Sequence, residues 1–98
     1  MHDRRKAPRI RVTWTCSLQR HAGGPIRGRT MDVGPEGMRV LTIRPLSVDE
    51  VLDFDVSEGE KEISGKARVM REEGHGTYGL RFESLPKAMR DELTTMCA

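Results

Sequence analysis

Two short segments of the sequence carry side chains that could bind an anionic ligand with flat rings. The first is Arg5-Lys6-Ala7-Pro8-Arg9, in which two arginines stand four residues apart and Pro8 disfavours a helix. A guanidinium group is a planar fork of donors that can hold a phosphate or the N7 and O6 edge of guanine. This segment therefore predicts contacts to a phosphate or to a guanine.

The second segment is Asp32-Val33-Gly34-Pro35-Glu36-Gly37, an acidic residue that leads from an expected strand into a glycine turn. A carboxylate accepts hydrogen bonds from the N1–H and N2–H groups of guanine, and glycines let a ring approach the backbone. Each segment alone is common in proteins. Together, in this order and separated by residues 10–31, they indicate a guanine nucleotide site.

The charge of the chain is concentrated near its N-terminus. Residues 1–31 have a net charge of +7 and the remainder −5, against +2 for the whole chain. This split predicts that the basic segment binds an anion or docks on the acidic half of the protein; a solvated basic tail is the simpler alternative. Nucleic acid is disfavoured because the sequence has few aromatic residues for base stacking: Trp14, Phe54, Tyr78 and Phe82.

The sequence offers little for catalysis or for a metal site. Its three histidines are scattered, and it has neither a zinc-protease motif, nor a nucleophile elbow, nor a phosphate-binding P-loop. Cys16 and Cys97 match no disulfide framework or zinc spacing, which suits a reducing cytoplasm, and Cys16 is expected in the core. We interpret Asp49-Glu50 and Glu72-Glu73 as solvated loop charges. We expect no enzyme activity, metal, cofactor or membrane insertion.

The pattern of apolar residues predicts six short strands followed by one helix. Period-two alternation and glycine-containing turns place the strands at residues 10–19, 26–32, 38–43, 52–57, 63–69 and 78–82. Leu85, Met89, Leu93 and Met96 then line one face of a helix at about 84–97. The expected fold is all-β, a six-stranded antiparallel β-barrel closed by a C-terminal helix. We divide the chain into a flexible basic arm, residues 1–8, and a barrel domain, residues 9–98.

These motifs resemble the PilZ domain family, bacterial receptors for cyclic di-GMP. The family pattern is R-x-x-x-R, a variable gap, and then [D/N]-x-S-x-x-G. Arg5 and Arg9 match its first part, with Arg4 preceding them, and Asp32 and Gly37 match the ends of the second. The runs Gly37-Met38-Arg39-Val40 and Gly79-Leu80-Arg81-Phe82 also look like the family. Its fold, a six-stranded antiparallel barrel with a C-terminal helix, agrees with the periodicity.

The resemblance implies a set of ligand-binding residues. Arg4, Arg5 and Arg9 would grip the phosphates and guanines of cyclic di-GMP as the arm folds over the ligand. Asp32 would accept hydrogen bonds from a guanine edge, and Gly37 would allow close approach. Gly34 stands where the family has a serine, and loss of that hydroxyl would remove about 1.5–3 kcal/mol, or one to two decades of affinity.

The function implied is a cytoplasmic cyclic di-GMP receptor and adaptor. It would order its arginine-rich arm over the ligand and relay the signal to a downstream protein effector in motility, biofilm formation or polysaccharide regulation. Two alternatives stay open. A degenerate PilZ-like adaptor would not bind cyclic di-GMP because Gly34 replaces the motif serine. A small nucleic-acid binder would show a steep dependence of affinity on salt.

Overall fold

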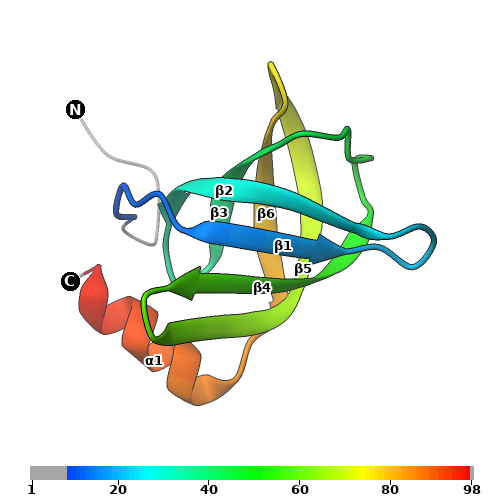
Figure 1. Cartoon of the computed structure of the whole chain (residues 1–98). Coiled ribbons are helices and arrows are strands. Elements are labelled where there is room, and N and C mark those ends of the chain that lie inside the picture. The colour runs from blue at the N-terminus through cyan, green and yellow to red at the C-terminus, as the bar shows by residue number, and fades with distance from the viewer. Residues whose placement is uncertain (1–8, 98) are drawn as a thin grey trace.

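The alternating apolar residues form six strands, and the final apolar stripe forms one helix (Figure 1). The computed structural model describes residues 9–97. Its elements are β1 (Thr15–Gln19), β2 (Pro25–Val33), β3 (Gly37–Thr42), β4 (Val51–Glu58), β5 (Lys61–Gly74), β6 (Thr77–Ser84) and α1 (Lys87–Met96). The strands form a closed antiparallel barrel in the order β1-β2-β3-β6-β5-β4, so the fold predicted from the sequence is confirmed.

The first strand closes the barrel because it pairs on both sides. Cys16 lies opposite Gly28 of β2 and opposite Val56 of β4, and both ladders are antiparallel. Within residues 9–97, closure pairs every strand on both sides over part of its length, which shortens the free edges of unpaired backbone groups. Outside the bulges of β2 and β5, alternate residues of the strands point inward, and Phe54 and Phe82 stack within the core with their ring centroids 5.1 Å apart.

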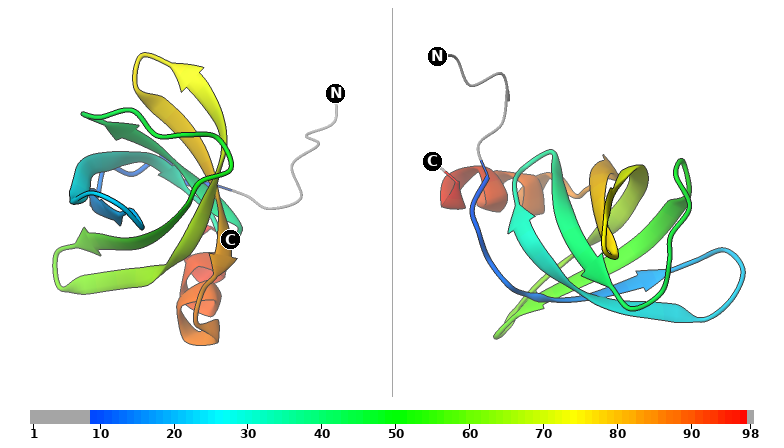
Figure 2. Two further views of the ribbon diagram at one scale, coloured as in Figure 1. Left: turned by 90° about the vertical axis from the view of Figure 1, so that its right-hand side faces the viewer. Right: turned by 90° about the horizontal axis from the view of Figure 1, so that it is seen from above.

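Helix α1 covers one end of the barrel, as the views in Figure 2 show. Leu93 is fully buried, and Met89 and Met96 pack against the core from the same face of the helix. Leu85, which precedes the helix, also packs against the core. Pro86 precedes the first helical turn, where its missing N–H group leaves no hydrogen bond unmade. Within residues 9–97 there is no helix of the length and apolar character needed to cross a bilayer.

Two strand boundaries differ from the sequence prediction by five residues, while the other boundaries of strands and helix agree to within three. The prediction for β1 started at residue 10, but the ladder starts at Thr15 because residues 10–14 contact β2 only at isolated points. The prediction for β5 ended at residue 69, but the strand continues to Gly74. Register shifts between Val69 and Arg71, and again between Glu72 and Gly74, interrupt the alternation there. The expected arm, residues 1–8, lies outside the described residues.

Gly37 is required where β3 and β6 approach each other. A Cβ atom at this position would collide with the carbonyl oxygen of Leu80. We therefore expect Gly37→Ala to lower the free energy of unfolding by about 1–3 kcal/mol, the usual cost of overpacking. Urea denaturation measures the change. Gly24→Ala is the control, since no atom lies within 4 Å of its added Cβ; equal losses in both variants would contradict this role for Gly37.

Candidate ligand-binding site

A β-bulge in β2 decides which way Asp32 faces. Thr30 lies opposite Val40, yet Asp32 lies opposite Arg39, so Met31 is an extra residue on this strand. Without the bulge, the alternation of Ile26 and Thr30 would turn Asp32 into the barrel. The extra residue shifts the alternation by one position. Asp32 therefore takes the outer face beside Arg39.

The segment that precedes β1 is tied to β2 around this bulge. Ile10 and Val33 exchange backbone hydrogen bonds of 2.9 Å in each direction, which puts Arg9 across from Gly34 in this antiparallel pairing. Further along, the buried Thr30 hydroxyl accepts a hydrogen bond of 2.8 Å from the backbone N–H of Trp14 and donates one of 2.7 Å to the carbonyl of Val12. These contacts fix the position of Arg9 relative to Asp32.

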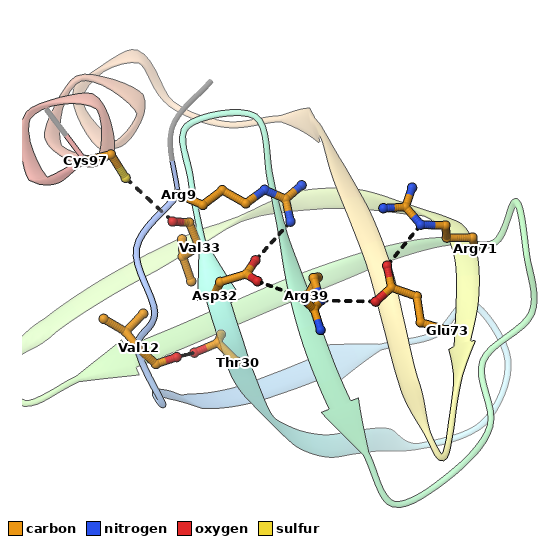
Figure 3. A network of polar contacts seen from close by, with 9 residues as sticks. All are labelled: Arg9, Val12, Thr30, Asp32, Val33, Arg39, Arg71, Glu73 and Cys97. Carbon is orange, nitrogen blue, oxygen red and sulfur yellow. Dashed lines mark hydrogen bonds and ion pairs between the residues drawn. The ribbon is translucent and has the colours of Figure 1, made fainter. Parts of the chain in front are cut away.

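Both carboxylate oxygens of Asp32 are engaged by arginines (Figure 3). Arg9 Nη1 donates to Oδ1 over 2.9 Å, and Arg39 Nη1 donates to Oδ2 over 3.2 Å. Asp32 is only 8% exposed, and a carboxylate so far removed from water is stable as an anion only when it is paired. Arg9 and Arg39 satisfy that requirement.

The ion pairs continue from Arg39 to the far end of β5. Arg39 Nε lies 3.1 Å from Glu73 Oε1, and Arg71 Nε lies 3.0 Å from Glu73 Oε2. The Arg39–Glu73 contact lacks hydrogen-bond alignment, and Arg39 Nε is a buried donor without a hydrogen-bond partner. Glu73 is thus not the solvated loop charge that the sequence suggested. Glu50 is not a solvated loop charge either, because Arg20 donates hydrogen bonds to its carboxylate and these lower its pKa.

An open depression of about 500 Å³ lies beside Asp32 on the outer face of β2 and β3. It is lined by Arg11, Thr13, Arg29, Thr30, Met31, Asp32, Arg39 and Leu41. A second open depression, of about 520 Å³, shares Arg29 and Leu41 with the first and extends to Arg27 and Ile43. The size of the first depression suits a small organic ligand, and its three arginines against one carboxylate suit an anionic one.

The turn from β2 to β3 is held by contacts from three directions. The N–H of Gly34 donates to Gly37 O over 2.9 Å, and the N–H of Phe82 donates to Glu36 O over 2.9 Å. From α1, Arg90 Nη1 donates to Pro35 O over 3.0 Å. Packing alone requires a glycine at position 37, because a Cβ there would collide with the carbonyl oxygen of Leu80. The close approach of a ligand is not needed to explain this residue.

The structure brings four of the six predicted site residues together. Arg9 contacts Asp32, while Gly34 and Gly37 form the adjoining turn; Arg4 and Arg5 lie outside the described residues. Sequence reasoning missed the arginines that line the pocket with Asp32: Arg11, Arg29 and Arg39. Arg39 could have been found as the outward residue of the strand after the turn, but its pairing with Asp32 depends on the bulge in β2.

The two thiols do not form a reactive centre. Burial raises the pKa of Cys16 to about 12, so this thiol stays protonated at neutral pH, and its predicted place in the core is confirmed. Burial also raises the pKa of Cys97, whose Sγ donates to Val33 O over 3.6 Å. In the part of the chain that the structure describes, no three His, Cys, Asp or Glu side chains cluster as metal ligands would.

Comparison with known proteins identifies the family. The model of the PilZ domain family matches residues 3–98, so the chain belongs to this family of cyclic di-GMP receptors and adaptors. No curated protein matches the sequence.

Two solved structures share the fold. The PilZ domain of YcgR from Escherichia coli, solved with c-di-GMP, has a TM-score of 0.79 and 17% identity over 97% of this chain and 89% of its own. The Bacillus subtilis inhibitor of motility, MotI/DgrA, has a TM-score of 0.81 and 17% identity over 98% of this chain. The present chain covers 50% of MotI. At this identity the likeness concerns the fold alone.

Thr30 is expected to stabilise the segment that carries Arg9. Thr30→Val keeps the shape of the side chain but leaves the N–H of Trp14 and the carbonyl of Val12 without their partner. We expect a loss of about 1–3 kcal/mol in the free energy of unfolding, measured by urea denaturation. Thr15→Val, at an exposed position of β1, should change it by no more than about 0.5 kcal/mol. Similar values for both variants would contradict the role of Thr30.

Proposed function

We propose that this PilZ domain is a receptor for cyclic di-GMP that binds its ligand in the pocket beside Asp32. The observation that supports the proposal most is the contact of Arg9 with Asp32, the two motif segments meeting at the edge of an arginine-lined depression. The ligand is anionic through its phosphates and offers donor edges through its guanines. Arginines and a carboxylate match these two features.

In this proposal the arginines on Asp32 exchange partners when the ligand binds. The Asp32 oxygens, which now accept from Arg9 and Arg39, would accept from guanine N1–H and N2–H. The released Arg9, whose side chain is 24% exposed, would reach a phosphate or the N7 and O6 edge. In such an exchange Asp32 keeps hydrogen-bond donors and the arginines gain phosphate or guanine acceptors, so no buried polar group is left without a partner. Arg4 and Arg5, outside the described residues, would add further contacts.

The same proposal gives the domain an adaptor role. Exposed Arg11 and Arg29 line the pocket, so an anionic ligand would neutralise positive charge on the outer face of β2. A downstream protein that contacts this face would bind better either to the positively charged, ligand-free form or to the neutralised, ligand-bound form. The inhibitor of motility among the structural relatives favours a motility partner. Two buried, free thiols suit action in the cytoplasm.

A ligand-free adaptor is the second candidate, and two observations favour it. Gly34 replaces the motif serine, and Asp32 is already satisfied by two arginines without a ligand. In this version the barrel serves protein interaction alone. Titration with cyclic di-GMP separates the two candidates directly.

We expect isothermal titration of the full chain to show low-micromolar or tighter binding of cyclic di-GMP. Arg9→Ala should weaken it about ten- to hundredfold, since a hydrogen bond to a charged group contributes roughly 1.5–3 kcal/mol, and Arg5→Ala/Arg9→Ala should abolish it. Arg44→Ala removes an exposed arginine away from the pocket and should leave the affinity within about twofold. No binding up to hundreds of micromolar would overturn the receptor and favour the ligand-free adaptor.

Gly34→Ser restores the family motif and should tighten binding by up to one to two decades. Gly34 is not among the described glycines with a positive φ, so a side chain at this position causes no left-handed backbone strain. The comparison is the titration of Gly34→Ala, which adds the Cβ without the hydroxyl. If the serine and alanine variants bind alike, the hydroxyl makes no contact with the ligand, and the motif departure does not limit affinity.

A further inference from the structure

Arg39 connects the ligand pocket to a carboxylate two strands away. Arg39 stands on β3 opposite Gly79 of β6, and Gly79 stands opposite Arg71 of β5. Because Gly79 has no side chain, Arg39 can reach across β6 to Glu73, as Figure 3 shows. A Cβ at Gly79 would already touch Glu73 Oε2 at 3.4 Å. The glycine thus leaves the space in which these two side chains meet.

Glu73 occupies the position of an anion held between two guanidinium groups. One carboxylate oxygen lies against Arg39 and the other against Arg71, and the side chain is 23% exposed. The same arrangement of donors suits a phosphate. Since Arg39 also lines the depression beside Asp32, an anionic ligand there and Glu73 would compete for one arginine.

The contact with Glu73 leaves Arg39 incompletely satisfied. Its Nε lies 3.1 Å from the carboxylate but is a buried donor without an aligned acceptor. A buried donor in this state gains more from a well-placed acceptor than a satisfied donor does. A phosphate oxygen entering from the pocket could supply that acceptor, while Arg39 Nη1 already points toward the site through Asp32.

We propose that Glu73 is an internal competitor of the ligand, a carboxylate that holds Arg39 in the free protein and gives it up to a ligand phosphate. Arg39 is then a phosphate-binding residue outside the sequence motif, and Glu73 sets the ligand concentration at which the site fills. This inference rests on the proposed binding of cyclic di-GMP. Arg71 retains Glu73 after the exchange, so the displaced carboxylate keeps a cationic partner.

The test is titration of the full chain and its variants with cyclic di-GMP. Glu73→Gln should tighten binding about five- to tenfold, because Arg39 no longer has an anionic partner on that side. The neighbouring Glu72→Gln removes the same charge from an exposed residue for which the structure of residues 9–97 shows no ion pair. It should stay within about twofold of the wild type. Unfolding curves of both variants check that the barrel is intact.

Two further variants separate competition from a general charge effect. Glu73→Asp keeps the charge but shortens the reach across Gly79, so it should also tighten binding. Arg39→Gln should weaken binding, and adding Glu73→Gln to it should bring no gain, since the two residues act as one unit.

Each outcome decides a different point. Equal or weaker binding by Glu73→Gln, with clear binding by the wild type, would overturn the competitor role and leave the receptor standing. A gain that persists in the Arg39→Gln background would also overturn it. No binding of cyclic di-GMP by the wild type would overturn the receptor and this inference together.

Discussion

The pairing of one buried carboxylate constrains the whole site. Asp32 is nearly inaccessible to water, and a lone anion in such a place is costly, so cations must accompany it. Arg9 comes from before the first strand and Arg39 from the third, and each supplies one donor to one oxygen. The bulge at Met31 turns Asp32 outward without exposing it, so cationic partners are required on the outer face of β2. A single extra residue in β2 therefore dictates what must surround it.

The strands and the helix were predictable because burial alternates along them. Cys16 and Leu18, for example, face the core, while Ser17 between them is half-buried and the flanking residues of β1 are exposed. The same signal failed at residues 10–14. Trp14 is buried and Val12 half-buried, so the side chains alternate as in a strand, while the backbone is held by Thr30 and Val33 instead of a ladder. Side-chain patterns report burial, and they do not report which backbone groups pair.

Some residues of the candidate site were predictable from the sequence and others were not. The proximity of Arg9 and Asp32 was predictable, because the family pattern assigns both residues to one ligand site, but their direct contact was not predicted. Arg39 and Glu73 carry no motif, and their contact depends on a shifted register in β2, a missing side chain at Gly79 and an extension of β5 beyond its apolar run. None of these is a property of either residue. Only the three-dimensional arrangement shows that Glu73, one of two acidic residues beside a turn, contacts an arginine that lines the depression.

The backbone of the site is held more firmly than its side chains. Backbone hydrogen bonds join Ile10 to Val33, and contacts from β6 and α1 hold the turn that follows Asp32. The arginines, by contrast, contact the carboxylates through the ends of long side chains that are 24% and 36% exposed at Arg9 and Arg39. A ligand can exchange those contacts without breaking any strand. If the site binds cyclic di-GMP as proposed, the signal would therefore be carried by surface charge and arginine positions, since the barrel that supports them has no need to change.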